Sequence, residues 1–245
     1  MAVLADFSQR RGITFPLLSD AGSAVIRNYG ILNTTVPSSN QQQYGIPFPG
    51  TFILNVRGVV TSRVFEAAYQ ERNTISSIMI RLGGQMNASA ATQVTAPHLQ
   101  LTTFVTDETV APGTHFSIVV EGMPDKNVHV YAPGVTGYKP LALAIDPQPG
   151  LVPRGSQFPK AEDYFFKPLN EHVPVYLRRF RVVQDLTIDG SRDTELALRD
   201  VPRLTITGSL TYQACDDKVC FLPQAVPLTW TVGLKPLDRE RAKPH

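Results

Sequence analysis

The chain has 245 residues, of which 42% are hydrophobic and 18% are charged, so it can build a sizeable core in one large or two medium domains. Its 23 Lys and Arg nearly balance 21 Asp and Glu, and a net charge of +2 does not favour nucleic acid or an anionic membrane surface as a partner. No run of about 18 apolar residues is present, so we expect no membrane span.

Helix and strand signals alternate in the first third of the chain. A short helix is predicted around residues 3–7, and a second one between a cap at Ser19 or Asp20 and a stop at Gly30. Residues 51–56 and 59–65 predict two strands. The strongest helix signal follows, with apolar residues spaced at i, i+3, i+4 and i+7: Ile75, Ile78, Met79 and Leu82.

Two motifs in this part suggest a family. They read GITFPLLSD at 12–20, followed by YGI at 29–31, and PGTFILN at 49–55, followed by GVV at 58–60. With them, residues 1–82 resemble the peroxiredoxin family of alkyl hydroperoxide reductase and thiol-specific antioxidant. The resemblance implies a partial thioredoxin-like α/β module with a cis-proline at Pro49.

The family's peroxidatic cysteine has no counterpart here, because no cysteine precedes Cys215. Peroxide reduction needs a thiolate of low pKa, so we expect the chain as given not to be a peroxidase. We interpret residues 1–82 as the C-terminal half of a redoxin domain. Residues 1–11 do not form a signal peptide, which predicts a cytoplasmic protein as given and a periplasmic one if a signal precedes Met1.

An uncharged stretch rich in Gly, Ala, Ser and Thr at 83–97 is predicted to be a linker, and 236–245 a charged tail. Between them, residues 98–235 carry about seven short strand signals separated by Pro and Gly turns. This pattern predicts an immunoglobulin-like β-sandwich, so the fold class is α/β plus all-β. The expected strands are 99–105, 116–121, 128–132, 141–145, 173–183, 204–212 and 226–234.

The only two cysteines, Cys215 and Cys220, lie five residues apart between two apolar strands. A disulfide closing so small a loop constrains the unfolded chain little, and a strained or exposed disulfide is prone to exchange. We therefore interpret the pair first as redox-active. A structural hairpin disulfide, or two reduced thiols, is the alternative. Asp216 and Asp217 disfavour a thiolate beside them and Lys218 offsets this only in part, so we expect reaction mainly within a docked complex.

Three separated stretches suggest a second family. They are VAPG at 110–113 with VHVY at 128–131, EDYFFK at 162–167, and YQAC at 212–215 with Cys220 and Pro223. In order and spacing they resemble the N-terminal domain of the bacterial transmembrane thiol:disulfide interchange reductase DsbD, an immunoglobulin-like sandwich whose cysteine pair relays electrons. The four residues between the cysteines here are one fewer than is usual for that domain.

This second resemblance implies roles for the matched positions. Cys215 and Cys220 become the catalytic, exchanging pair, and a thioredoxin-like protein or a redoxin domain becomes the redox partner. An aromatic cap loop covers the disulfide, and further residues line the site: Glu162, Asp163, Tyr164, Phe165, Tyr131 and His129. Ordinary core packing is the alternative for the aromatic residues, and a satisfied surface or core histidine is the alternative for His129.

Other chemistry has little support. A zinc or copper site built from Cys215, Cys220 and His129 is disfavoured, because it has only three ligands and no Cys-x-x-Cys, and no cofactor is expected. The alternative function is a non-enzymatic interaction or oligomerisation module with a structural disulfide, and a homo-oligomer stays open. The stretch LVPRGS at 151–156 is identical to a thrombin cleavage site; we interpret it as a natural, exposed loop.

Overall fold

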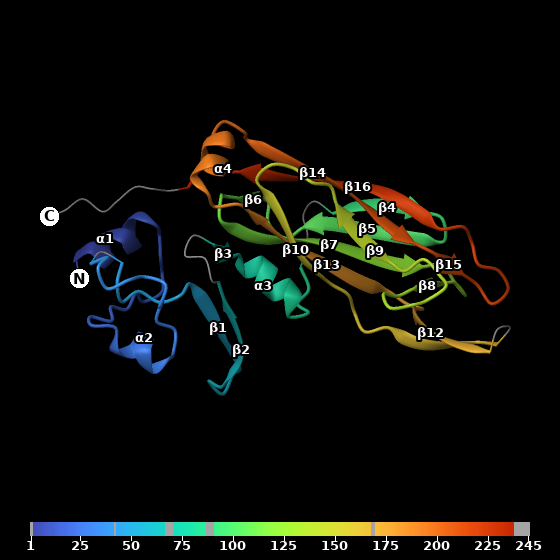
Figure 1. Cartoon of the computed structure of the whole chain (residues 1–245), viewed down its shortest axis with the longest axis horizontal. Coiled ribbons are helices and arrows are strands. Elements are labelled where there is room, and N and C mark those ends of the chain that lie inside the picture. The colour runs from blue at the N-terminus through green and yellow to red at the C-terminus, as the bar shows by residue number, and fades with distance from the viewer. Residues whose placement is uncertain (1, 42, 67–70, 87–90, 168–169, 238–245) are drawn as a thin grey trace. The chain divides into compact units, whose positions relative to one another are not determined.

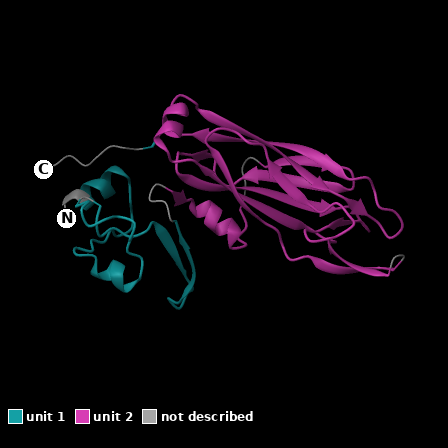
Figure 2. Cartoon of the chain, in the orientation of Figure 1, with its two compact units in different colours: residues 1–70, 237–245 teal, residues 71–236 magenta. Residues whose placement is uncertain are grey.

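The computed structural model of the chain divides into two compact units (Figure 2). Unit 1 comprises residues 1–70 and 237–245, and unit 2 comprises residues 71–236. No helix in the described part of the chain is long and apolar enough to cross a membrane. The described residues are 2–41, 43–66, 71–86, 91–167 and 170–237.

Unit 1 has the helices and strands that its sequence predicts (Figure 1). The N-cap residue of the second helix is Ser23, and the carboxylate of Asp20 accepts hydrogen bonds from the first-turn N–H groups of Val25 (3.2 Å) and Ile26 (2.9 Å). These bonds hold the pKa of Asp20 below its ordinary value. The elements are α1 (Ala2–Arg10), α2 (Ala24–Asn28) and an antiparallel hairpin of β1 (Gly50–Leu54) and β2 (Val60–Phe65).

The described part of unit 1 lacks a buried apolar core. Its buried residues are Ser23, Asn33 and Pro49, whereas Phe15 is 64% and Leu18 is 89% exposed. A unit of about 70 residues needs substantial apolar burial to be stable by itself. Unit 1 therefore has too little buried apolar surface to account for its own folding.

The predicted cis-proline at Pro49 is wrong, because none of the described peptide bonds is cis. Pro49 is buried, and its carbonyl accepts a hydrogen bond from the Glu66 amide at 2.9 Å, one residue beyond the paired Gly50 and Phe65. The proline thus extends a regular hairpin edge. The trans form is the intrinsically preferred one, and an ordinary extended strand does nothing to favour the cis isomer.

Unit 2 contains two facing sheets that form the predicted sandwich (Figure 1). Their neighbouring strands are antiparallel, except that β3 runs parallel to β7 and β6 parallel to β16. The first sheet has the order β10 (Leu151–Gln157), β13 (Phe180–Ile188), β7 (Thr114–Pro124), β5 (Leu99–Val105) and β4 (Thr92–Ala96), with β3 (Arg72–Asn73) beside β7. The second has the order β6 (Thr109–Val110), β16 (Gln224–Leu234), β14 (Arg203–Tyr212) and β9 (Ala142–Ile145), and α4 (Arg192–Ala197) lies between β13 and β14 in sequence.

One apolar core joins the two sheets. Ile118 and Leu186 of the first sheet and Ile206 of the second are fully buried in it, together with Trp230 at 4% exposure. The alternating residues of β14 and β16 point into this core every second position, as their sequences predict. The all-β part of the fold class is therefore confirmed as an immunoglobulin-like sandwich.

A short helix, α3 (Ile75–Arg81), covers the outer face of the first sheet. Ile80 packs with Phe104, Val119 and Val183, so β7 is buried on both faces. The predicted helix exists, but its buried apolar residues are Ile78 and Ile80, whereas Ile75 is 81% exposed. Docking onto the sheet, rather than the helical repeat, decides which face is buried.

The boundary between the units differs from the predicted linker at 83–97. Residues 71–86 belong to unit 2, because β3 pairs with β7 and the Thr74 hydroxyl donates to Asp107 at 2.8 Å. Strand β4 then occupies 92–96 of the predicted linker and pairs with β5 along its whole length. Residues 87–90 of that linker and 238–245 of the predicted tail lie outside the described residues.

The third sheet of unit 2 is smaller, and it carries the cysteines. The predicted strand 173–183 is in fact two strands, separated at Leu177, Arg178 and Arg179, all of which are exposed. β12 joins the third sheet and β13 the first. The stretch 151–156, expected to be an exposed loop, is an edge strand; its first residue, Leu151, is buried in the core and the residues after it are exposed as predicted. The third sheet has the order β11 (Glu162–Phe166), β12 (Glu171–Tyr176), β8 (His129–Tyr131) and β15 (Ala214–Cys215).

Candidate functional site

Cys215 and Cys220 form a disulfide across a tight turn that follows β15, with Cα atoms 4.1 Å apart. The turn is closed by the Asp216 amide, which donates to the Val219 carbonyl at 3.0 Å. The Asp216 carboxylate accepts from the amides of Lys218 and Val219, each at 2.7 Å, and these bonds lower its pKa. Local hydrogen bonds therefore hold both sulfurs at bonding distance.

The two cysteines differ sharply in exposure. Cys215 is 0% exposed and packs with Tyr131, Val173 and Val175, whereas Cys220 is exposed. Register explains this difference, because Cys215 is paired with His129 inside the third sheet while Cys220 lies on the returning chain at the edge. An external thiolate therefore finds the sulfur of Cys220 more accessible than that of Cys215.

Tyr131 lies directly against the disulfide. Its hydroxyl is 3.3 Å from Sγ of Cys215 and 3.5 Å from Sγ of Cys220, and its side chain is only 1% exposed. Its ring stacks on Tyr138 with 4.1 Å between centroids and an interplanar angle of 18°. The Tyr138 hydroxyl in turn donates a short hydrogen bond to the carboxylate of Glu171 on β12. Two tyrosines and one carboxylate thus form a continuous chain from the sulfurs.

His129 lies two residues before Tyr131 on β8 and is 2% exposed. Its ring meets Tyr131 edge-on at 5.3 Å and Tyr164 at 4.6 Å. Its Nε2 is buried without a hydrogen-bond partner among the described residues. Burial lowers the pKa of His129, and the opposing influence of Asp217 and Asp216 is smaller. We conclude that the imidazole is neutral and incompletely satisfied.

Tyr164 connects the hairpin of β11 and β12 to the cysteine turn. Its hydroxyl donates to Oδ1 of Asp217 at 2.6 Å, and its ring packs against the buried cluster around Cys215. The bond to Asp217, followed by burial, raises the pKa of Tyr164 to about 12, so the hydroxyl stays protonated at neutral pH. We call β11 and β12 the cap hairpin.

The structure brings together the two cysteines, Tyr131, His129 and Tyr164, but it directs the other predicted lining residues elsewhere. Phe165 lies on the opposite face of β11 and packs on His172, with 4.9 Å between ring centroids. Asp163 also bonds to His172, at 2.7 Å, and Glu162 pairs with Arg178 at 2.9 Å. Because neighbouring side chains in a strand alternate between faces, Asp163 and Phe165 cannot share the side of Tyr164.

Tyr138 and Glu171 were missed by the sequence reasoning. Tyr138 lies in the loop after β8 and Glu171 begins β12, 33 residues later. The sequence signal for Tyr138 was an aromatic residue next to Gly137, soon after the matched stretch 128–131. No sequence signal marked Glu171.

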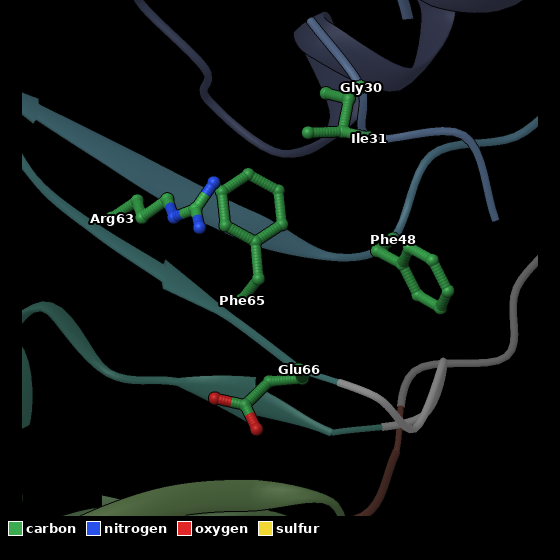
Figure 3. A pocket seen from close by; sticks show the side chains of 6 residues that line it. All are labelled: Gly30, Ile31, Phe48, Arg63, Phe65 and Glu66. Carbon is green, nitrogen blue, oxygen red and sulfur yellow. The ribbon is translucent and has the colours of Figure 1, made fainter. Parts of the chain in front are cut away.

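Unit 1 has a pocket of about 470 Å³ (Figure 3). Its lining offers one guanidinium, one carboxylate and two phenyl rings, but no thiol or hydroxyl side chain: Gly30, Ile31, Phe48, Arg63, Phe65 and Glu66. This set can bind a small molecule but provides no redox-active group. Both cysteines of the chain lie in unit 2.

Comparison with known proteins agrees with a two-part chain. Residues 1–63 match the family model described as the AhpC/TSA family, which confirms the peroxiredoxin resemblance of unit 1. No curated protein matches the chain closely enough to count as a relative.

Among solved structures, the chain is similar to the N-terminal periplasmic domain of ScsB from Proteus mirabilis, with 13% identity and a TM-score of 0.39 over 56% of this chain and 49% of that one. It is also similar to the N-terminal domain of DsbD from Neisseria meningitidis in the reduced form, with 18% identity and a TM-score of 0.32 over 48% of this chain and 81% of that one. The chain thus spans about half the length of the first of these structures.

Proposed function

We propose that unit 2 is a thiol–disulfide exchange module that relays electrons through Cys215 and Cys220. The observation that carries this proposal is the unequal exposure of a bonded pair: Cys220 is an exposed residue, whereas Cys215 is 0% exposed and lies beside a hydroxyl. A purely structural staple does not require this asymmetry. The motif resemblance of 110–131, 162–167 and 212–223 to the DsbD N-terminal domain supports the same function.

The reaction begins when a thiolate of a reduced donor attacks Sγ of Cys220 in line with the disulfide. A bond forms between the donor sulfur and Cys220, the bond between Cys220 and Cys215 breaks, and its electron pair remains on Cys215 as a thiolate. The second thiol of the donor, as a thiolate, then attacks the donor's first sulfur in the mixed disulfide, and the bond between that sulfur and Cys220 breaks. This step releases an oxidised donor and leaves two reduced cysteines, with two electrons and two protons transferred.

The donor or acceptor is proposed to be a thioredoxin-like protein, because such proteins present a dithiol on an accessible surface and exchange through mixed disulfides. The reduced module passes its electrons on by the reverse sequence. In that direction the Cys220 thiolate attacks the acceptor disulfide, and Cys215 resolves the mixed disulfide.

Trapping of mixed disulfides tests the proposal. The Cys215→Ser variant leaves the exposed thiol and is expected to form a stable mixed disulfide with a thioredoxin-like protein on mild oxidation. The Cys220→Ser variant retains only the buried thiol and is expected to form little. Equal trapping by both variants contradicts the assignment of Cys220 as the attacked sulfur, and trapping by neither contradicts exchange.

The interaction module with a structural disulfide is the second candidate. The buried Cys215 and the hairpin closed by the bond favour it, because both are features of a staple. The reduction potential separates the two functions. A value between about −120 and −270 mV fits the known exchange proteins, and a value below about −300 mV fits a structural disulfide.

A further inference from the structure

The buried sulfur poses a problem for the proposed exchange reaction, on which the following inference rests. When Cys220 is attacked, the leaving thiolate forms on Cys215, a residue with 0% exposure. Burial destabilises an anion, raises the pKa of a thiol, and so makes it a poorer leaving group. Asp216 and Asp217 add negative charge nearby. A group of the protein itself must therefore donate a hydrogen bond to this sulfur.

Tyr131 is the only side chain that the structure places within hydrogen-bonding distance of Sγ of Cys215, among the described residues. Its hydroxyl is nearly as close to Sγ of Cys220, at 3.5 Å, and therefore lies alongside the bond that breaks. We propose that Tyr131 is a catalytic residue whose hydroxyl donates a hydrogen bond to Sγ of Cys215 as the thiolate develops. Tyr138 and Glu171 are positioning residues for it.

The hydroxyl of Tyr131 remains a donor under all ordinary conditions. Burial, and then the proximity of Tyr138 and a hydrogen bond with the Tyr138 hydroxyl, raise the pKa of Tyr131 far above that of a free phenol. The nearby carboxylate of Glu171 and the Tyr164 phenol act in the same direction. Tyr131 therefore does not ionise itself when the thiolate forms, and it stabilises the charge by hydrogen bonding.

Tyr138 and Glu171 fix the tyrosine at this place. The nearly parallel rings of Tyr131 and Tyr138, 4.1 Å apart, limit the swing of Tyr131 away from the sulfurs. Glu171 holds Tyr138 through the short bond to its hydroxyl, and it does so from β12, the strand next to β8 in the sheet. Removal of either partner is thus expected to act on the sulfur chemistry through Tyr131 alone.

Reduction by dithiothreitol tests this inference without any protein partner. The full-length oxidised protein is mixed with excess dithiothreitol, and the second-order rate constant is followed by quenching and thiol counting. We expect Tyr131→Phe to lower the rate constant about tenfold, as for loss of one hydrogen bond to a charged group that is partly developed in the transition state. Tyr138→Phe and Glu171→Gln are expected to lower it about threefold, a smaller effect because the Tyr131 hydroxyl itself remains.

Tyr176→Phe is the matched control. Tyr176 is also buried, with its hydroxyl bonded to the Pro159 carbonyl at 3.0 Å, away from the sulfurs. We expect this variant to keep the wild-type rate constant. If it slows reduction as much as Tyr131→Phe does, loss of any buried hydroxyl explains the effect and the inference fails.

A pKa measurement distinguishes a catalytic from a structural role. In the Cys220→Ser background, NMR titration of isotope-labelled Cys215 reports the pKa of the single thiol. We expect Tyr131→Phe to raise this pKa by about one unit, the equivalent of tenfold, and Tyr138→Phe to raise it less. An unchanged rate constant together with an unchanged pKa in Tyr131→Phe overturns the inference.

These outcomes are independent of the proposed function. If no thioredoxin-like protein is ever trapped by Cys215→Ser, the relay fails, while the response to dithiothreitol still reports on Tyr131. Conversely, a rate constant and a Cys215 pKa that are both unchanged in Tyr131→Phe overturn the catalytic tyrosine and leave the relay intact.

Discussion

The hydrogen bond between Tyr164 and Asp217 connects the cap hairpin to the cysteine turn, and a double-mutant cycle measures its contribution. Asp217 lies in the turn that carries Cys220, so this bond ties the turn to β11. A hydrogen bond to a charged group contributes about 1.5–3 kcal/mol when it is buried, and the exposure of Asp217 reduces this to about 1 kcal/mol. That free energy corresponds to about a fivefold change in the population of molecules in which the cysteine turn is released from β11.

Asp217 lies in the turn that must move when the bond between Cys215 and Cys220 breaks, and the tie restrains this turn. We therefore expect Tyr164→Phe to increase the rate constant of disulfide reduction by dithiothreitol about fivefold. Asp217→Ala is expected to increase it more, because this change also removes a negative charge that repels the attacking thiolate. In the Tyr164→Phe background, however, Asp217→Ala should show only the effect of the charge. The difference between the two effects of Asp217→Ala gives the coupling free energy of the tie.

The rate constants are measured by quenching and thiol counting, as for Tyr131. Thermal unfolding of the same variants is expected to show little change in midpoint. Phe165→Leu is the control, because Phe165 lies on the other face of the same strand. Additive effects of the two substitutions on the rate would refute the argument that the bond restrains the cysteine turn. A control variant as fast as Tyr164→Phe would show that any disturbance of β11 releases the turn.

Three further predictions concern other parts of the chain. Because the pKa of His129 is lowered in the folded protein, the unfolded protein binds more protons, and stability falls as the pH drops below about 6.5. His129→Phe should therefore lessen the fall in melting temperature between about pH 7 and pH 5. An unchanged dependence of the melting temperature on pH would contradict this. Thrombin should cut 151–157 slowly in the native protein and fast in urea, because β10 is exposed but hydrogen-bonded to β13, and fast native cleavage would contradict the strand. The isolated segment 71–236 should unfold cooperatively in urea with its disulfide intact, whereas the isolated segment 1–70 should show no cooperative transition, given its lack of buried apolar residues; circular dichroism would reveal the opposite behaviour.

The sequence predicts the central strands well, because their signal is local. β14 and β16 alternate between apolar and polar residues over their full length and pair without interruption from Arg203 with Gly233 to Tyr212 with Gln224. The edge strand β10 lacks that signal, since every side chain after Leu151 is exposed, and β4 has only five residues, of which only Ala96 is buried. A strand that is this short or this exposed shows little apolar alternation, so its sequence resembles a linker or a loop.

Tertiary docking explains the errors around residues 71–86. The periodic residues of α3 predict a helix but not its partner, and the partner is the outer face of the first sheet. Arg81 reaches Asp185 at 3.4 Å, and Asp185 also accepts from the Ser117 hydroxyl at 2.7 Å. These contacts join residues more than 60 positions apart, which composition alone cannot reveal. The unit boundary therefore lies on the N-terminal side of this segment.

The same reasoning applies to the candidate site. Motifs identified Cys215, Cys220, Tyr131, His129 and Tyr164, because each lies in a stretch with a recognisable order. The alternation of side chains along β11 is also a property of the sequence, and it alone separates Tyr164 from its two neighbours in the chain. What the sequence could not supply was the environment of the buried sulfur.

That environment decides the chemistry of the pair. A spacing of five residues shows only that the cysteines can form a disulfide. It does not show which sulfur a partner attacks or how a thiolate on the other is stabilised. Strand β8 determines both, since its register with β15 buries Cys215 and its last residue, Tyr131, places a hydroxyl near both sulfurs. If burial alone governed the reaction, Cys215 would be a poor leaving group and the disulfide would behave as a staple. The position of Tyr131 is therefore the structural feature that favours exchange over a structural role.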